Sequence, residues 1–254
     1  MNTATKPAPV HVADDLSAAD LRAALAAGWR DFLAHPLYGM FFGAIYAVTG
    51  SLVAYALLWR GEAGWLVPIT AGFPLIAPFA AVGLYEVSRR REQGEPLSWG
   101  AVLGALRGRG DEQLLMMGGF VFVAFSFWVI IAHAIFAIFM AESGMGGESL
   151  EALLSPTGLT MLGVGTAVGA VLAWFFYTIT VISLPMLVDR DIDFISAIIA
   201  SVQAVKRNTG VMLGWAVIIA TTLAVAMIPL FLGLLVVLPV LGHATWHLYR
   251  RAVS

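Results

Sequence analysis

The sequence predicts an all-α membrane protein with six transmembrane helices. Three observations lead to this fold class: the composition, six long apolar segments, and the one-sided distribution of Lys and Arg between those segments. Of the 254 residues, 60% are hydrophobic and only 12% are charged, whereas soluble domains are about 25% charged. The mean hydropathy of +0.87 implies more apolar surface than one soluble core of this length can bury, so the surplus must face lipid.

Charge and cysteine content exclude several classes of protein. The net charge of -2 gives no basic field that would attract nucleic acid. The absence of Cys excludes disulfides, thiolate metal sites and Cys nucleophiles. The first 36 residues contain Asp14, Asp15 and Asp20 and no apolar stretch behind a basic start. We therefore expect no cleavable signal peptide, and the first span is expected to direct insertion.

Six segments are long and apolar enough to cross the membrane, because a span needs roughly 20 apolar residues. The fourth is long enough to tilt or to project beyond the bilayer. The fifth and sixth are contiguous, and Pro229 predicts a turn between them because proline interrupts a helix. The predicted spans are 37–59, 65–88, 114–140, 157–188, 209–227 and 230–249.

Basic residues predict the orientation of these spans. In a six-span arrangement every Lys and Arg except Arg60 falls on one side, and the loop 141–156 contains Glu but no base. Since cytoplasmic loops carry the excess of Lys and Arg, both termini are expected in the cytoplasm. Residues 60–64 and 141–156 are expected in the periplasm, so the predicted location is a bacterial inner membrane.

The chain also shows a weaker, threefold pattern. A short amphipathic stretch precedes each pair of spans, as expected of a helix that lies in the membrane interface. The pattern predicts three repeats of an interfacial helix plus a transmembrane hairpin, at about 16–88, 97–188 and 191–249. Residues 1–15 are predicted to be a flexible segment, and 16–254 a single membrane domain. The apolar residues of the three stretches are Leu21, Leu25, Trp29, Phe32, then Trp99, Val102, Leu103, Leu106, then Phe194, Ile198, Val202, Val205, and the returning spans contain Pro74, Pro78, Pro185 and Pro239.

Four segments carry a resemblance to a known family. They are GWRDFLAHP at 28–36, PFAAVGLYEVSR at 78–89, LPMLVDRDIDF at 184–194 and ATWHLYR at 244–250. Together they resemble an uncharacterised family of bacterial integral membrane proteins, some of whose members are labelled cytochrome c oxidase subunit I. The resemblance runs from about residue 29 to residue 250. It implies a polytopic membrane protein without an established activity.

The oxidase label does not fit the residues. A haem-copper catalytic subunit, as that label implies, needs about twelve spans and six metal-binding histidines, whereas this chain has five His. A single haem or metal would need converging ligands, and His35, His243 and His247 are candidates near the inner interface. His133 lies about 28 Å from the cytoplasmic start of its span. Histidines that bond to backbone carbonyls or lipid phosphates are the favoured interpretation, and no cofactor is expected.

Acidic residues near the span ends have two interpretations each. Glu86 is a candidate proton relay, but Arg89 and Arg90 follow at helical spacing and favour a same-helix ion pair. Asp189, Asp191 and Asp193 resemble a hard-cation site. Capping of the next helix by Asp191 or Asp193, together with charge pairing, is the favoured alternative.

Glycine pairs indicate helix packing and carry no chemistry. Gly39/Gly43 and Gly165/Gly169 match the small-xxx-small pattern of membrane helices. Phosphate-binding glycine loops, HExxH and Gly-x-Ser-x-Gly motifs are absent from the sequence. We therefore expect no enzymatic activity.

Two functional hypotheses remain from the sequence. The first is a non-catalytic accessory, assembly or scaffold protein whose partners are the lipid bilayer and other membrane proteins, with no nucleic acid. The oxidase label suggests a respiratory complex as its neighbour. The second is a small-solute transporter or channel, favoured by the repeat and by the proline-interrupted spans. A polar pore would favour the second hypothesis, and a closely packed apolar core would favour the first.

Overall fold

The computed structural model describes residues 11–60, 81–105, 113–141 and 153–253, and these parts of the chain are mainly helical. Residues 81–93 also form a helix. The named helices are α1 (Ala18–Ala34), α2 (Pro36–Arg60), α4 (Trp99–Gly104), α5 (Gln113–Ala141), α7 (Pro156–Thr180), α8 (Ser183–Asp189), α9 (Phe194–Arg207), α10 (Thr209–Met227) and α11 (Leu234–Ala252).

Four helical segments within the described ranges are long and apolar enough to cross a membrane. They are α2, the first 27 residues of α5, the segment Pro156–Asp189 that joins α7 and α8, and α10. These four coincide with the first, third, fourth and fifth predicted spans. The second predicted span lies largely outside the described residues, and the sixth corresponds to α11, which is not one of the four.

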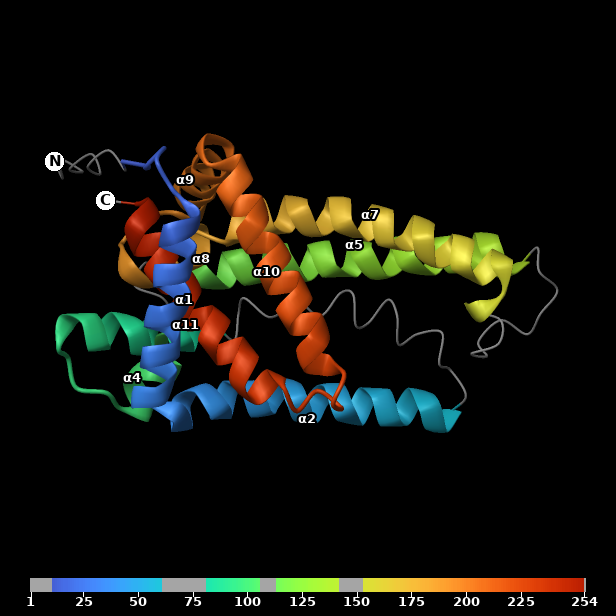
Figure 1. Cartoon of the computed structure of the whole chain (residues 1–254), viewed down its shortest axis with the longest axis horizontal. Helices are drawn as coiled ribbons and strands as arrows, with labels where there is room; N and C mark the ends of the chain where they lie inside the picture. Colours follow the sequence, from blue (N-terminus) through green and yellow to red (C-terminus); the bar gives the residue numbers. More distant parts are fainter. Residues whose placement is uncertain (1–10, 61–80, 106–112, 142–152, 254) are drawn as a thin grey trace, which may run out of the picture.

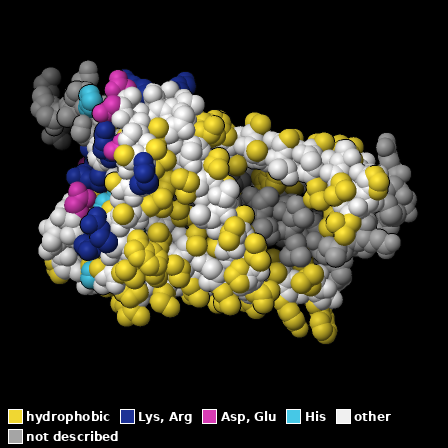
Figure 2. Space-filling model, viewed as in Figure 1, with side chains coloured by type: hydrophobic (Ala, Val, Ile, Leu, Met, Phe, Trp, Pro, Cys, Tyr) yellow, Lys and Arg dark blue, Asp and Glu magenta, His cyan; other side chains and the backbone are white. Residues whose placement is uncertain are grey.

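The long helices share one direction. Figure 1 shows α2, α5 and α7 running along the long axis of the molecule, with α1 lying across one end of them. Charged and histidine side chains gather at that same end in Figure 2, whereas apolar side chains cover the rest of the visible face. We call the layer formed by α1, residues 81–93, α8, α9 and the C-terminal half of α11 the polar end.

The fourth predicted span is interrupted. The helix breaks at residues 181–182 and continues as α8, whose residues Ser183 to Val188 are buried. Pro185 supplies the reason, because it cannot donate a hydrogen bond to the carbonyl of Val181 one turn earlier. The Ser201 hydroxyl of α9 compensates: it accepts the Ile182 N–H at 3.2 Å and donates to the Thr178 carbonyl at 2.7 Å.

The chain turns between α10 and α11 at Pro229, as predicted. This hairpin does not reach as far along the long axis of the molecule as α2 does. Leu230 and Phe231 adopt positive φ values of 51° and 66° in this turn. The Ser51 hydroxyl donates to the Leu230 carbonyl at 2.9 Å, so the turn lies beside Ser51. Because α2 continues to Arg60, it extends roughly 14 Å beyond the hairpin turn. The sixth predicted span therefore accompanies only the first part of α2.

Helix α1 packs closely along α11 because glycine removes a side chain at their contact. A Cβ on Gly28 would lie 2.5 Å from the Ala244 nitrogen and 2.7 Å from the Val240 oxygen. The predicted Gly39/Gly43 pair also faces α11: a Cβ on Gly43 would lie 2.8 Å from Leu235 Cα. Of the second pair, Gly169 packs on Trp128 of α5, whereas a Cβ on Gly165 would meet nothing within 4 Å.

The three predicted amphipathic stretches fall on helices of unequal length. They correspond to α1 with 17 residues, α4 with 6 and α9 with 14. On α1 the buried face contains Leu21 and Phe32, but Trp29 of the predicted stripe is 45% exposed. Leu106 of the second stretch lies outside the described residues.

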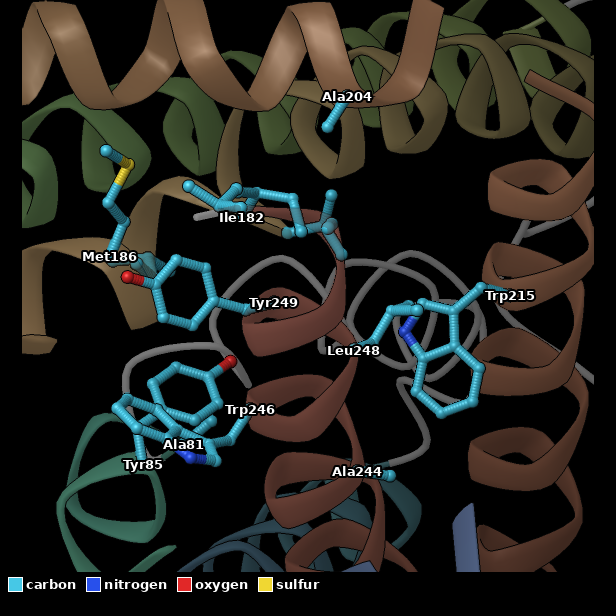
Figure 3. Packing of buried hydrophobic residues seen from close by; sticks show 14 of the residues in the cluster. Ala81, Tyr85, Ile182, Met186, Ala204, Trp215, Ala244, Trp246, Leu248 and Tyr249 are labelled. Carbon is cyan, nitrogen blue, oxygen red and sulfur yellow. The ribbon is translucent and has the colours of Figure 1, made fainter. Parts of the chain in front are cut away.

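The main apolar core lies between the polar end and the first turns of α10, which contribute Met212 and Trp215. Trp215, Trp246 and Tyr249 are fully buried in it, and Figure 3 shows the last two on α11 with Trp215 on the neighbouring helix α10. The N-terminal segment belongs to this layer as well. The Asn208 side chain accepts the Leu16 N–H at 3.0 Å and donates to the Ala13 carbonyl at 2.8 Å. Val12 forms an isolated bridge with Val253.

Candidate functional site

A buried polar network at the polar end is the main concentration of chemically capable side chains in the described structure. Its centre is Asp31 of α1, which is 5% exposed. Asp31 accepts hydrogen bonds from Ser88 at 2.6 Å and from the ring Nε2 of His247 at 2.8 Å, both on Oδ2. Its other oxygen, Oδ1, pairs with the guanidinium of Arg91. Three elements, α1, residues 81–93 and α11, thus meet at one carboxylate.

His243 extends this network into the core. Its Nδ1 lies 2.7 Å from the Ser88 hydroxyl oxygen. Since the single proton of Ser88 is donated to Asp31, that oxygen must accept from His243, which assigns the proton to Nδ1. The ring is fully buried and its Nε2 has no hydrogen-bond partner among the described residues. The chain of contacts therefore runs from half-exposed Arg91 through Asp31 and Ser88 to a buried imidazole.

The Asp31 carboxylate is stabilised in its charged form. Burial by itself raises the pKa of Asp31, but the hydrogen bonds from His247 and Ser88 and the nearby imidazoles outweigh this effect and lower the pKa below its ordinary value of 3.8. A charged, fully hydrogen-bonded carboxylate is a good structural acceptor and a poor general base. The arrangement therefore fits a device that holds three helices together better than a catalytic site.

A second polar contact surrounds Glu86. It pairs with Arg89 at 2.7 Å and with Arg90 at 2.6 Å, so the predicted same-helix ion pair is present. Arg89 is 2% exposed and also contacts Glu95 at 3.2 Å. Since both oxygens of Glu86 are engaged by guanidinium groups, this carboxylate is occupied by structural partners.

A third polar contact ties α8 to α11. Asp189 accepts from the Tyr249 hydroxyl at 2.7 Å and from Arg250 at 3.1 Å. Arg250 also donates to Glu92 at 3.1 Å, and Glu92 accepts from the Trp246 indole at the same distance. Residues far apart in the sequence are thereby linked across the polar end.

The remaining predicted residues lie apart from these contacts. His35 ends α1 and its ring packs edge-on against Tyr38. His133 is on the exposed face of α5, and Asp191 is exposed in the loop after α8. Asp193 caps α9 by accepting the Ser196 N–H at 2.9 Å, as predicted. Within the described residues, no three His, Asp or Glu side chains converge in a way that could hold a metal ion.

Asp31, Ser88 and Arg91 were not among the candidate residues predicted from the sequence. A signal for Asp31 was present, since it continues the helical spacing of the buried residues Leu21 and Gly28 of α1. A carboxylate on the apolar face of a helix requires a buried partner. The partners themselves are 57 residues away for Ser88 and 216 for His247, so local sequence patterns could not identify them.

An apolar cavity of about 350 Å³ lies next to this polar layer. It is lined by α7, α10, α11 and the start of the helix at 81–93. Three of its hydroxyl groups, those of Tyr177, Thr180 and Thr245, donate to backbone carbonyls at 2.8, 2.7 and 2.8 Å. The cavity therefore presents mainly hydrocarbon to its contents.

The comparisons agree with the predicted family. Residues 66–189 match the model of a family described as predicted integral membrane protein (DUF2189). The match covers just under half of the chain and includes the motif at 78–89 and the start of the motif at 184–194. It confirms the resemblance to an uncharacterised membrane protein family. No curated protein and no solved structure matched the chain.

Proposed function

We propose that this integral membrane protein is a non-catalytic accessory, assembly or scaffold component that acts through its helices and its polar face. The observation that carries the proposal is that side chains of the protein itself already engage both oxygens of the buried carboxylate. Asp31, a buried carboxylate, is bound by Ser88, His247 and Arg91. Such a network rigidifies a surface that other proteins can bind.

We further propose that the polar end faces the cytoplasm of a bacterial inner membrane, with both termini on that side. The gathering of basic side chains at this end supports the proposal (Figure 2). Reporter fusions at Gly147 and at the C-terminus test it. We expect a periplasm-only reporter to be active at Gly147 and inactive at the C-terminus, and the opposite result would overturn the orientation.

The number of crossings is part of the same proposal. With α2, the span 65–88, α5 and α7 as four crossings, α10 and α11 return the chain to the starting side whether they cross fully or partly. Six full crossings and the threefold repeat of 16–88, 97–188 and 191–249 remain the finer proposal. An Ile228→Cys variant labelled with a membrane-impermeant thiol reagent on the periplasmic side determines the depth of the hairpin turn. Only a full crossing exposes that position to the periplasm.

The alternative function, a small-solute transporter or channel, rests on the threefold repeat and the proline-interrupted spans predicted from the sequence. The apolar lining of the cavity favours the scaffold hypothesis, because it offers a polar solute few hydrogen-bonding groups. Co-purification of the full chain from native membranes provides the test. We expect membrane-protein partners at stoichiometric amounts, and no solute flux in vesicles that contain the purified chain alone. Flux that follows a solute gradient in those vesicles would favour the transporter.

We propose that the protein holds no stoichiometric haem or transition metal. His243 and His247 are both engaged in the Asp31 network, and His133 belongs to a different helix. Absorption spectroscopy and metal analysis of the purified chain test this. A Soret band that disappears in His243→Ala or His247→Ala would overturn the proposal.

A further inference from the structure

The apolar cavity between α7, α10 and α11 has the features of a built site. Its lining extends along α7 from Ala170 to Thr180 and along α10 from Leu213 to Leu223, which is a length of about 15 Å. Small side chains such as Ala173, Ala216 and Gly242 create the space. The site is thus a slot that runs nearly parallel to the two spans that border it.

The slot opens toward the surroundings of the helix bundle. Leu213 and Val217 line it and are also 50% and 53% exposed. Both lie on α10, which is apolar enough to cross a membrane. The opening therefore faces the acyl region of the bilayer and not water.

One polar group in the slot is free to bind a ligand. Tyr85 lines the cavity and is 3% exposed, and its hydroxyl has no hydrogen-bond partner among the described residues. Tyr85 immediately precedes Glu86, so it lies where the apolar slot meets the polar end. Buried tyrosine hydroxyls normally find a partner, and this one lies at the end of the slot that borders the polar end.

We propose that this slot binds one acyl chain of a membrane phospholipid, with the Tyr85 hydroxyl donating a hydrogen bond to the ester carbonyl of that chain. The glycerol and headgroup of the lipid would extend out of the slot through the opening beside Leu213, past the start of α10. Lys206, in the last turn of α9 just before α10 begins, is exposed and would supply a cation for the lipid phosphate. The occupant is thus a single lipid held specifically, in contrast to the exchanging lipids around the other helices.

The test is titration of the delipidated full chain with dioleoyl phosphatidylglycerol and with its ether-linked analogue, followed by native mass spectrometry. We expect the wild type to bind one ester lipid more tightly than the ether analogue. Ala216→Phe fills the slot and should weaken binding of both lipids at least ten-fold. Tyr85→Phe should weaken binding of the ester lipid about five-fold, the worth of one hydrogen bond, and leave the ether lipid unchanged.

Matched variants keep the result interpretable. Val171→Phe adds the same ring to α7 at a position that is 70% exposed and outside the slot, and it should bind both lipids as the wild type does. Ala173→Leu narrows the slot from the opposite wall and replaces Ala216→Phe should that variant fail to fold. Equal binding by the slot variants and the wild type would overturn the proposal. Equal losses for ester and ether lipids in Tyr85→Phe would overturn the assignment of the hydrogen bond.

Discussion

The polar end and the far parts of the long helices are held together in different ways. At the polar end, charged groups from distant parts of the sequence meet in buried contacts, as Asp31 meets Arg91 and His247. Beyond it, only 17% of the most apolar window of α2, and the same share for α5, is buried within the chain. One region is stabilised by its own interior, and the other requires an apolar surrounding, which the bilayer supplies.

This difference implies that the two regions respond to different mutations. Loss of a partner inside the polar end leaves a buried charge or a buried polar atom without compensation. An apolar substitution on the exposed face of a long helix exchanges one lipid contact for another. Thermal unfolding of purified variants in detergent measures this contrast.

The largest effect is expected for Asp31→Ala. It removes the acceptor shared by Ser88, His247 and Arg91, and breaking a buried ion pair from one side costs about 3–5 kcal/mol. The matched control is Asp191→Ala, whose carboxylate is exposed. Similar melting temperatures for the two variants would show that the network does not hold the polar end together.

A smaller loss is expected for Gly28→Ala. The added methyl group would meet backbone atoms of α11 at 2.5 and 2.7 Å, so α1 must move away, and overpacking of this kind costs about 1–3 kcal/mol. Gly165→Ala places the same group on α7 where nothing lies within 4 Å. We expect that variant to be as stable as the wild type or slightly more stable, because alanine favours a helix. If both variants lose stability equally, the contrast between the two regions fails.

The contribution of Asp31 to the stability of the folded chain should change with pH only in a narrow acidic range. The pKa of Asp31 is lower in the folded chain than its ordinary value of 3.8. Its stabilising contribution is therefore complete above that value and is lost as the pH falls through the folded-state pKa. Melting temperatures of the wild type and Asp31→Asn should converge in this acidic range and differ at neutral pH. A difference that stays constant down to the acid limit would contradict the assignment.

Sequence patterns predicted the apolar helices well because hydropathy is a local property. The bounds of α10 agree with the predicted span 209–227, and α2 exceeds the span 37–59 by one residue at each end. The depth of the α10–α11 hairpin could not be predicted, since it depends on the contact between Ser51 and Leu230, which are 179 residues apart. The same holds for the candidate site. His243 and His247 share a helix face, but only tertiary packing brings Asp31 and Ser88 to them.

The smallest effect is expected at the start of α9, where capping and cation binding were the two interpretations of the acidic loop. Asp193 accepts the Ser196 N–H at 2.9 Å, and loss of such a cap costs about 1 kcal/mol. Asp193→Ala should therefore lower the melting temperature slightly, whereas Asp191→Ala should leave it unchanged. Because a cap acts without a metal, the difference between the two variants should be the same in Ca²⁺ and in chelator. A difference that appears only when Ca²⁺ is present would instead assign these carboxylates to a cation site.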